Sequence, residues 1–131
     1  MSRVRYFDVG QWPIYVGFVN DEAAFKREMK RIKAGDVNFS ASNHADASTI
    51  SMIDEDGVLC VFVTLGSIKG KTFAQIAGLI AHEATHVAQS LWEHIGETNP
   101  SRETEAYFIQ FVTQSCLECL DPFACNFALE D

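Results

Sequence analysis

Runs of apolar residues separated by turn residues predict a small group of β-strands in the N-terminal half of the chain. Residues 4–19 are rich in β-branched and aromatic side chains but are interrupted by Gly10 and Pro13, which indicates one or two short strands. Further along, TISMI and VLCVFVTLG flank the turn DEDG and predict a β-hairpin. The second strand of this hairpin, Val58–Leu65, is apolar on both faces, so we expect it to be central in a sheet or covered.

Three segments have the apolar spacing of amphipathic helices, and each begins with a residue whose side chain can cap a helix. They cover residues 20–33, 72–94 and 101–120, with the caps Asn20 or Asp21, Thr72 and Ser101. The resulting order of elements (β, α, β-hairpin, α, α) predicts an α+β domain. In it, a short and mainly antiparallel sheet packs on the two C-terminal helices.

The composition indicates a single globular domain. The chain has 131 residues, of which 47% are hydrophobic and 21% charged, the balance of a soluble globular protein. We divide this domain (1–131) into an N-terminal sheet and helix (1–70), a helical pair (71–120) and a tail (121–131).

The charge of the chain argues against binding to nucleic acid. The formal net charge is −8, so the surface as a whole repels phosphate. The first helix carries a basic cluster interleaved with glutamates, which we interpret as a solvated face, with a phosphate-binding surface as the alternative. Its basic residues are Lys26, Arg27, Lys30, Arg31 and Lys33.

The chain also lacks the signals of membrane proteins and secreted proteins. No apolar run reaches the roughly 20 residues of a membrane-spanning helix, and the N-terminus has no apolar core of a secretion signal. We therefore expect no membrane association and a cytoplasmic location. In that reducing compartment the four cysteines are expected to be free thiols.

A candidate metal-binding motif, HEATH, lies in the middle of the second predicted helix. His82 and His86 are one turn apart, so they project side by side and can offer two nitrogens to one ion. Glu83 lies about 100° round the helix, where it cannot join the same coordination sphere but can reach a water on the metal. The apolar residues before the motif predict a buried helix, on which polar side chains are costly unless they are satisfied.

A third ligand is needed, because catalytic zinc normally has three protein ligands and a water. His94 lies about 12 Å beyond His86 along the same helix and is excluded. The next helix offers two carboxylates, Glu103 and Glu105, on different faces. Small Ala106 allows a close approach on the face of Glu103, so we predict Glu103 as the ligand and keep Glu105 as the alternative. Both acids are also explained without a metal, by stabilisation of a helix N-terminus.

These residues resemble a known family. A helix with HExxH, followed by a helix with Glu-x-x-Ala at Glu103 to Ala106, is similar to the gluzincins, the thermolysin-type zinc metallopeptidases, and above all to the small minigluzincins. The likeness covers residues 80–114. Tyr107 stands where related proteins often have an acid or amide that supports a histidine ligand. The wider pattern resembles small uncharacterised proteins of tailed bacteriophages and prophages, in Tyr15–Phe18, Ala81–Val87 and Ile95–Gln110.

The resemblance implies a small zincin-like fold and a zinc metallopeptidase encoded by a phage. Zn²⁺ would be held by His82, His86 and Glu103, and Glu83 would be the general base for a metal-activated water that attacks a peptide bond. The substrate would be a peptide or protein in the cytoplasm of the host bacterium.

Supporting roles follow from the same resemblance. The strand Val58–Leu65 would border the cleft and pair with an extended substrate. Tyr107 or His44 would donate a hydrogen bond to the oxyanion.

Two other readings of the motif stay open. The chain could keep the zinc site but act by binding a host protein, as a phage accessory or host-interaction protein without proteolysis. Alternatively, no metal binds and the histidine pair is structural.

The cysteines near the C-terminus carry a weaker signal. Cys116-x-x-Cys119, with Cys125 further on, is interpreted as core packing, with a second metal site or redox pair as the alternative.

Overall fold

The computed structural model describes residues 3–39 and 46–120 of the chain. This part has the predicted α+β architecture, with the elements in the predicted order, and residues 4–19 form two strands rather than one. The elements are β1 (Arg5–Phe7), β2 (Ile14–Val19), α1 (Glu22–Arg31), β3 (Ala47–Ile53), β4 (Leu59–Leu65), α2 (Phe73–Ile95) and α3 (Arg102–Glu118).

The strands form one mixed sheet in the order β1-β2-β4-β3. β1 and β2 are antiparallel, as are β3 and β4, whereas the neighbours β2 and β4 are parallel. Parallel neighbours need a long connection, which α1 and β3 provide between β2 and β4. β4 therefore lies inside the sheet, as the sequence predicts, and β3 lies at an edge.

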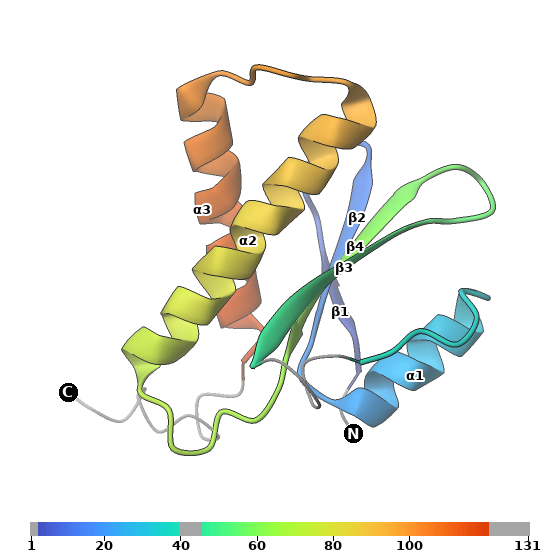
Figure 1. The fold of residues 1–131 in the computed structure, drawn as a ribbon, viewed down its shortest axis with the longest axis vertical. Coiled ribbons are helices and arrows are strands. Elements are labelled where there is room, and N and C mark those ends of the chain that lie inside the picture. The colour runs from blue at the N-terminus through green and yellow to red at the C-terminus, as the bar shows by residue number, and fades with distance from the viewer. Residues whose placement is uncertain (1–2, 40–45, 121–131) are drawn as a thin grey trace.

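Helices cover both faces of the sheet. Figure 1 shows α2 and α3 on one side of the strands and α1 on the other. Val61 and Val63 of β4 belong to the core under α2 and α3, whereas Cys60 and Phe62 belong to the core under α1. Every residue of β4 is buried. Burial on both faces explains the continuous apolar sequence of this strand.

The predicted caps begin the helices. Asp21 and Ser101 each accept a hydrogen bond from a backbone N–H three residues later, and Thr72 takes part in a capping box. α1 ends at Arg31 rather than at Lys33, because Lys33 already has the left-handed backbone conformation, with φ of 58°. In the part of the chain that is described, no helix is both long and apolar enough to cross a membrane.

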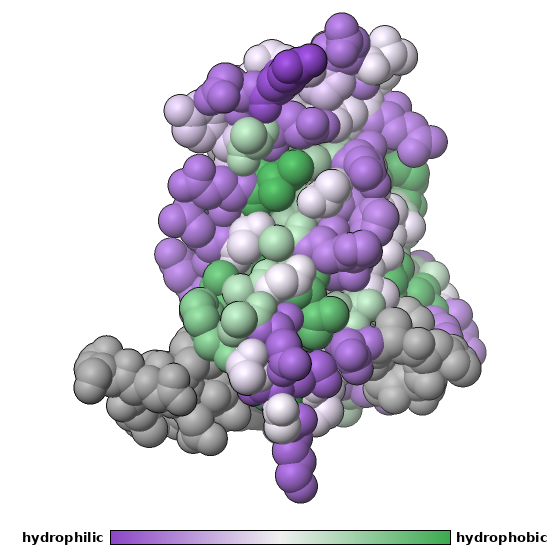
Figure 2. Space-filling view, turned by 60° about the vertical axis from the view of Figure 1, so that its left-hand side comes forward, coloured by the Kyte–Doolittle hydropathy of each residue, from purple (hydrophilic) through white to green (hydrophobic). Residues whose placement is uncertain are grey.

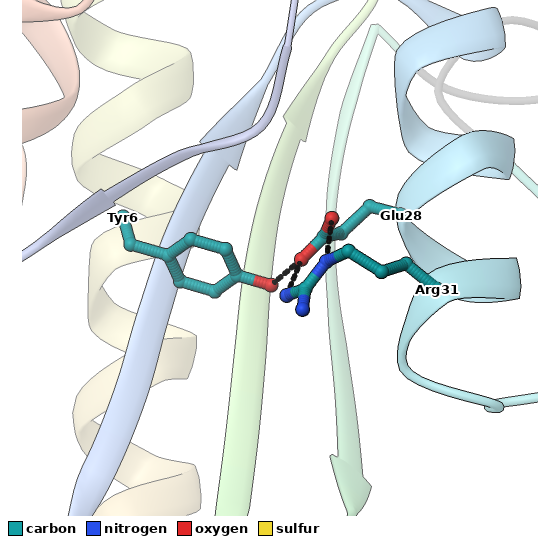
Figure 3. A network of polar contacts seen from close by, with 3 residues as sticks. All are labelled: Tyr6, Glu28 and Arg31. Carbon is teal, nitrogen blue, oxygen red and sulfur yellow. Dashed lines mark hydrogen bonds and ion pairs between the residues drawn. The ribbon is translucent and has the colours of Figure 1, made fainter.

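A network of three side chains holds α1 against β1 (Figure 3). The hydroxyl of Tyr6 donates to Oε2 of Glu28 at 2.5 Å, and Arg31 donates to both oxygens of the same carboxylate at 2.8 and 2.5 Å. The hydrogen bonds from Arg31 and Tyr6 hold the pKa of Glu28 below its ordinary value. Burial and the nearby carboxylate raise the pKa of Tyr6. Arg31, a member of the basic cluster, is thus paired within the protein.

The cysteines of the described part, Cys60, Cys116 and Cys119, are free thiols, as expected. Cys116 is fully buried in the core under α2 and α3. Burial raises the pKa of Cys116 and of Cys119, which disfavours the thiolate that metal binding or redox chemistry needs. This supports core packing for Cys116. Cys125 and the rest of the predicted tail, 121–131, lie outside the described residues.

Candidate metal centre

Two histidines lie side by side on the solvent-facing side of α2. Residues one turn apart share a face of a helix, and the ring centroids of His82 and His86 are 4.9 Å apart. Both side chains are exposed. The pair can therefore be reached from solvent, and it offers two imidazole nitrogens, which are ligands that zinc prefers.

A neighbouring amide orients one of the two rings. The Nδ1–H of His86 donates to Oε1 of Gln89 at 2.8 Å. A proton on Nδ1 leaves the lone pair on Nε2, which is then the nitrogen available to a metal. Histidines that bind metals normally have such a partner on the other nitrogen. Gln89 fits this supporting role, which the sequence did not reveal.

Glu83 lies next to the histidines but faces the sheet. It is 7% exposed, and the hydroxyl of Thr49 on β3 donates to its Oε1 at 2.8 Å. The same hydroxyl lies 3.1 Å from the backbone oxygen of Glu83. A buried carboxylate is costly unless it accepts hydrogen bonds, and Thr49 supplies one. Among the described residues no donor reaches Oε2, so that oxygen is left for a water or a substrate.

The edge strand β3 also contacts α2 through a pair of hydroxyl groups. Ser51 on β3 and Ser90 on α2 are hydrogen-bonded, with 2.9 Å between their oxygens. β4 pairs with strands on both sides, whereas β3 has a partner strand on one side only within the described part of the chain. The expectation that Val58–Leu65 pairs with a substrate is therefore wrong, because both of its edges are occupied. Beside Glu83, the strand that has a partner strand on one side only, among the described residues, is β3.

The structure does not bring the predicted third ligand to the histidines. α2 and α3 run in opposite directions (Figure 1), and the rings of Trp92 and Phe108 meet between them at 5.8 Å. His86 precedes Trp92 by six residues and Glu103 precedes Phe108 by five. Because the helices are antiparallel, His86 and Glu103 lie on opposite sides of that contact, about 16 Å apart along the helix axes. In the described residues no group of three or more His, Cys, Asp or Glu side chains is placed to hold a metal ion.

The face of α3 that carries Glu103 is exposed. Ala106 and Gln110 are exposed with it, and Glu105 is only partly exposed. The expectation that Ala106 brings the two helices together on this face is therefore wrong. Glu103 and its alternative Glu105 both stay predictions as zinc ligands. α3 packs through a different row of buried residues, Phe108, Val112 and Cys116.

A depression of about 760 Å³ opens beside the motif. Asp46 lines it just before β3, Lys69 and Lys71 line it from the loop between β4 and α2, and His82 and Glu83 line it from α2. A cavity where a few polar and charged groups converge is the usual form of a site for a small polar group. Glu83 thus lies at the border between the sheet and this depression.

A second depression, of about 590 Å³, lies between α3 and the connection from β1 to β2. Trp12, Tyr107 and Phe111 line it, and Tyr107 and Phe111 are 66% and 40% exposed. Tyr107, which the resemblance makes a candidate oxyanion donor, lines this depression rather than the one beside Glu83. On the face drawn in Figure 2, hydrophobic residues form small areas between hydrophilic ones. His44, the other candidate donor, lies outside the described residues.

Sequence reasoning missed the residues that surround Glu83. For the lysines a signal was present, because the loop GSIKGK directly precedes Thr72 and so has to lie at the start of α2. Thr49 had no comparable signal. It is 34 positions away from Glu83 along the chain, and the pairing of its strand sets where it lies.

Comparisons of the chain with known protein families, with curated proteins and with solved structures return no match. Evidence for a function therefore comes from the arrangement of α2, β3 and the depression beside them.

Proposed function

We propose that the chain carries a peptidase-type zinc site on α2 and hydrolyses a peptide bond, with Glu83 as the general base. One observation carries the proposal: His82 and His86 lie exposed and 4.9 Å apart, while Glu83 between them in sequence is buried and held by the edge strand. Burying the carboxylate of Glu83 lowers the stability of the fold, and a role in proton transfer would explain why a glutamate occupies this position.

His82 and His86 would supply two imidazole nitrogens as ligands, and zinc prefers such ligands. A zinc ion held there would supply Lewis-acid chemistry, polarising a carbonyl and lowering the pKa of a water towards 7. Oε1 of Glu83 is engaged by Thr49, so Oε2 is the atom that takes a proton from the attacking water. The same oxygen then delivers the proton to the amine that leaves.

An extended substrate can be placed by β3. Its outer edge, which has no partner strand among the described residues, can add a peptide through main-chain hydrogen bonds. Thr49 belongs to β3 and also holds Glu83, so a peptide on that edge would lie close to the general base. The proposed substrate is therefore a peptide or an unfolded segment of a protein, in the setting of a phage-infected bacterium.

Metal analysis tests the site. We predict about one zinc per chain in the purified protein, and loss of that zinc in His82→Ala and in His86→Ala. His94→Ala is the matched control, since His94 is exposed on the same helix but two turns away, and it should retain zinc. Zinc below stoichiometry in the wild-type protein would remove the proposal.

The same measurement decides the third ligand. Glu103→Gln should lower the zinc content if Glu103 moves to the histidines when metal binds, and Glu105→Gln should then leave it unchanged. The reverse result assigns the ligand to Glu105. If both variants keep zinc, neither residue is a ligand.

Glu83→Gln tests the chemistry. The variant should keep its zinc and lose about 10²- to 10⁴-fold in the rate of peptide hydrolysis, the usual contribution of a general base. In infected cells, proteomics should find a protein that is cleaved with the wild type and intact with Glu83→Gln. An effect on the host that survives in Glu83→Gln would exclude proteolysis as its cause.

The second candidate function is binding to another protein without hydrolysis. The observation that favours it is the aromatic depression, where Tyr107 and Phe111 are exposed next to Trp12. Exposed aromatic side chains are typical of the centres of protein interfaces. In that case Tyr107→Ala with Phe111→Ala should abolish the effect on the host, and Glu83→Gln should not.

A further inference from the structure

The depression beside Glu83 differs in charge from the chain as a whole. The chain has a formal net charge of −8, with 10 Lys and Arg against 18 Asp and Glu. Two of those cations, Lys69 and Lys71, line this one depression, together with the carboxylates of Asp46 and Glu83. Asp46 is paired with Lys71 at 3.5 Å and Glu83 is only 7% exposed, so the ammonium of Lys69 is the exposed charge of this depression that no acid among the described residues pairs with.

The two lysines differ in how they are held. The ammonium of Lys71 donates to the backbone oxygen of Ser67 at 3.2 Å and lies 3.5 Å from the carboxylate of Asp46. Its side chain is 22% exposed, so it is fixed in the wall. Lys69 is exposed, and among the described residues its ammonium has no hydrogen bond or ion pair. One cation is therefore held in place and the other is free to meet a ligand.

The position of these charges relates them to the reacting bond. His82 and Glu83 line the same depression as the two lysines. A substrate whose scissile carbonyl lies at the histidine pair would thus place a neighbouring group in reach of Lys69. The two lysines lie in the loop that ends at Thr72, the residue that caps α2. Loops anchored on a rigid element commonly carry the residues that bind a substrate group.

We propose that this depression recognises a carboxylate on the substrate, close to the bond that is cleaved. This inference rests on the proposed function and adds a substrate class to it. The carboxylate is either an Asp or Glu side chain or the C-terminus of the peptide. Both sources present the same charge to Lys69 and Lys71, and the experiment separates them.

The test is a retention assay with two matched peptide libraries. The hexapeptides contain Ala, Val and Leu at mixed positions and either Asp or its isostere Asn at one position, and each library is made with a free and with an amidated C-terminus. They are passed over immobilised, zinc-loaded Glu83→Gln protein and quantified by mass spectrometry. We expect Asp peptides or free C-termini to be retained about three- to fivefold over their neutral counterparts, the range of one exposed charge pair.

Variants of the lysines assign the preference. In the Glu83→Gln background, Lys69→Gln should reduce the ratio towards one, and Lys69→Glu should reverse it. Lys71→Gln should reduce the retention ratio as well. Because Lys71 also holds the loop through its hydrogen bond to Ser67, the Lys69 variants are easier to interpret. Lys30→Gln is the matched control, because Lys30 is an exposed lysine on α1, across the sheet from the site. It should leave the ratio unchanged.

Three results overturn the inference: equal retention of charged and neutral peptides, a preference that survives in Lys69→Glu, or absence of retention for every library. Hydrolysis of the same libraries by the wild-type protein separates this failure from failure of the proposed function. Cleavage without a charge preference removes the carboxylate pocket alone. Lysine-dependent retention without cleavage leaves the pocket and removes the peptidase.

Discussion

At the scale of single residues, the hydroxyl of Thr49 is the contact that fixes the Glu83 carboxylate. It donates to Oε1 at 2.8 Å, and its position on β3 makes it part of the wall that a substrate would follow. A side chain that orients a general base contributes to catalysis without touching the reacting atoms. In the proposed mechanism Thr49 is therefore a positioning residue.

We predict that Thr49→Val lowers kcat about 10- to 100-fold, with little change in KM, because the base loses its orientation. The zinc content should stay that of the wild type. Thr49→Ser keeps the hydroxyl and should restore kcat, which a role in packing alone would not predict. Steady-state kinetics on a peptide cleaved by the wild-type protein measures both variants.

The histidine pair and the Glu83–Thr49 contact show how far single residues can be predicted. His82 and His86 share a face because a helix places residues one turn apart together, and this local rule is visible in the sequence. Thr49 reaches Glu83 because β3 lies at the sheet edge under α2, which depends on the pairing of distant strands. Local patterns carry no information about that pairing.

At the scale of elements, α1 is attached to β1 through Glu28. The side chain of Glu28 is 14% exposed and accepts hydrogen bonds from Arg31 and Tyr6. Because the folded state lowers the pKa of Glu28, its ionised form stabilises the fold above the pKa it has when unfolded. That contribution is lost as the pH falls through the folded value.

We predict that Glu28→Gln lowers the free energy of unfolding by about 1 kcal/mol at neutral pH. The difference from wild type should be constant above the ordinary range of a glutamate pKa, about 4–5, and shrink as the pH falls through the lowered pKa of folded Glu28. Urea unfolding at a series of pH values measures this. Glu55→Gln, an exposed acid in the turn between β3 and β4, is the control and should show no such dependence.

The elements themselves were largely predictable, and their packing faces were not. The caps at Asp21, Thr72 and Ser101 marked the starts of the helices because a side chain that accepts from the first turn is a local requirement. For α3, small Ala106 suggested the packing face, but the row of Phe108 and its partners buries more apolar area and decides the orientation. That difference is why Glu103 lies on the exposed side.

At the scale of the whole molecule, the sheet joins two cores. α1 contributes Phe25 to one core, where its ring meets that of Phe62 at 6.2 Å. The two tryptophans of the chain, Trp12 and Trp92, lie in the other layer with their ring centroids 5.4 Å apart. Since β4 contributes to both cores, the layers should unfold together.

We predict that Phe25→Ala destabilises the protein by about 3–5 kcal/mol and lowers the midpoint seen by tryptophan fluorescence, although both tryptophans lie in the other layer. The midpoint from far-UV circular dichroism should fall by the same amount. A fluorescence midpoint that stays at the wild-type value would show that the layers unfold separately. Tyr15→Ala, at a 56% exposed position on β2, is the control for a change outside the cores.

The burial of α2 also limits how the chain can change during evolution. Between residues 76 and 92 of this helix, the exposed positions are 78, 82, 86 and 89, and the others are buried or partly buried. Mutations on that narrow strip would alter or remove the proposed zinc site without disturbing the core. A lineage of such proteins could therefore exchange catalysis for binding, or regain it, through substitutions at very few codons while the fold stays the same.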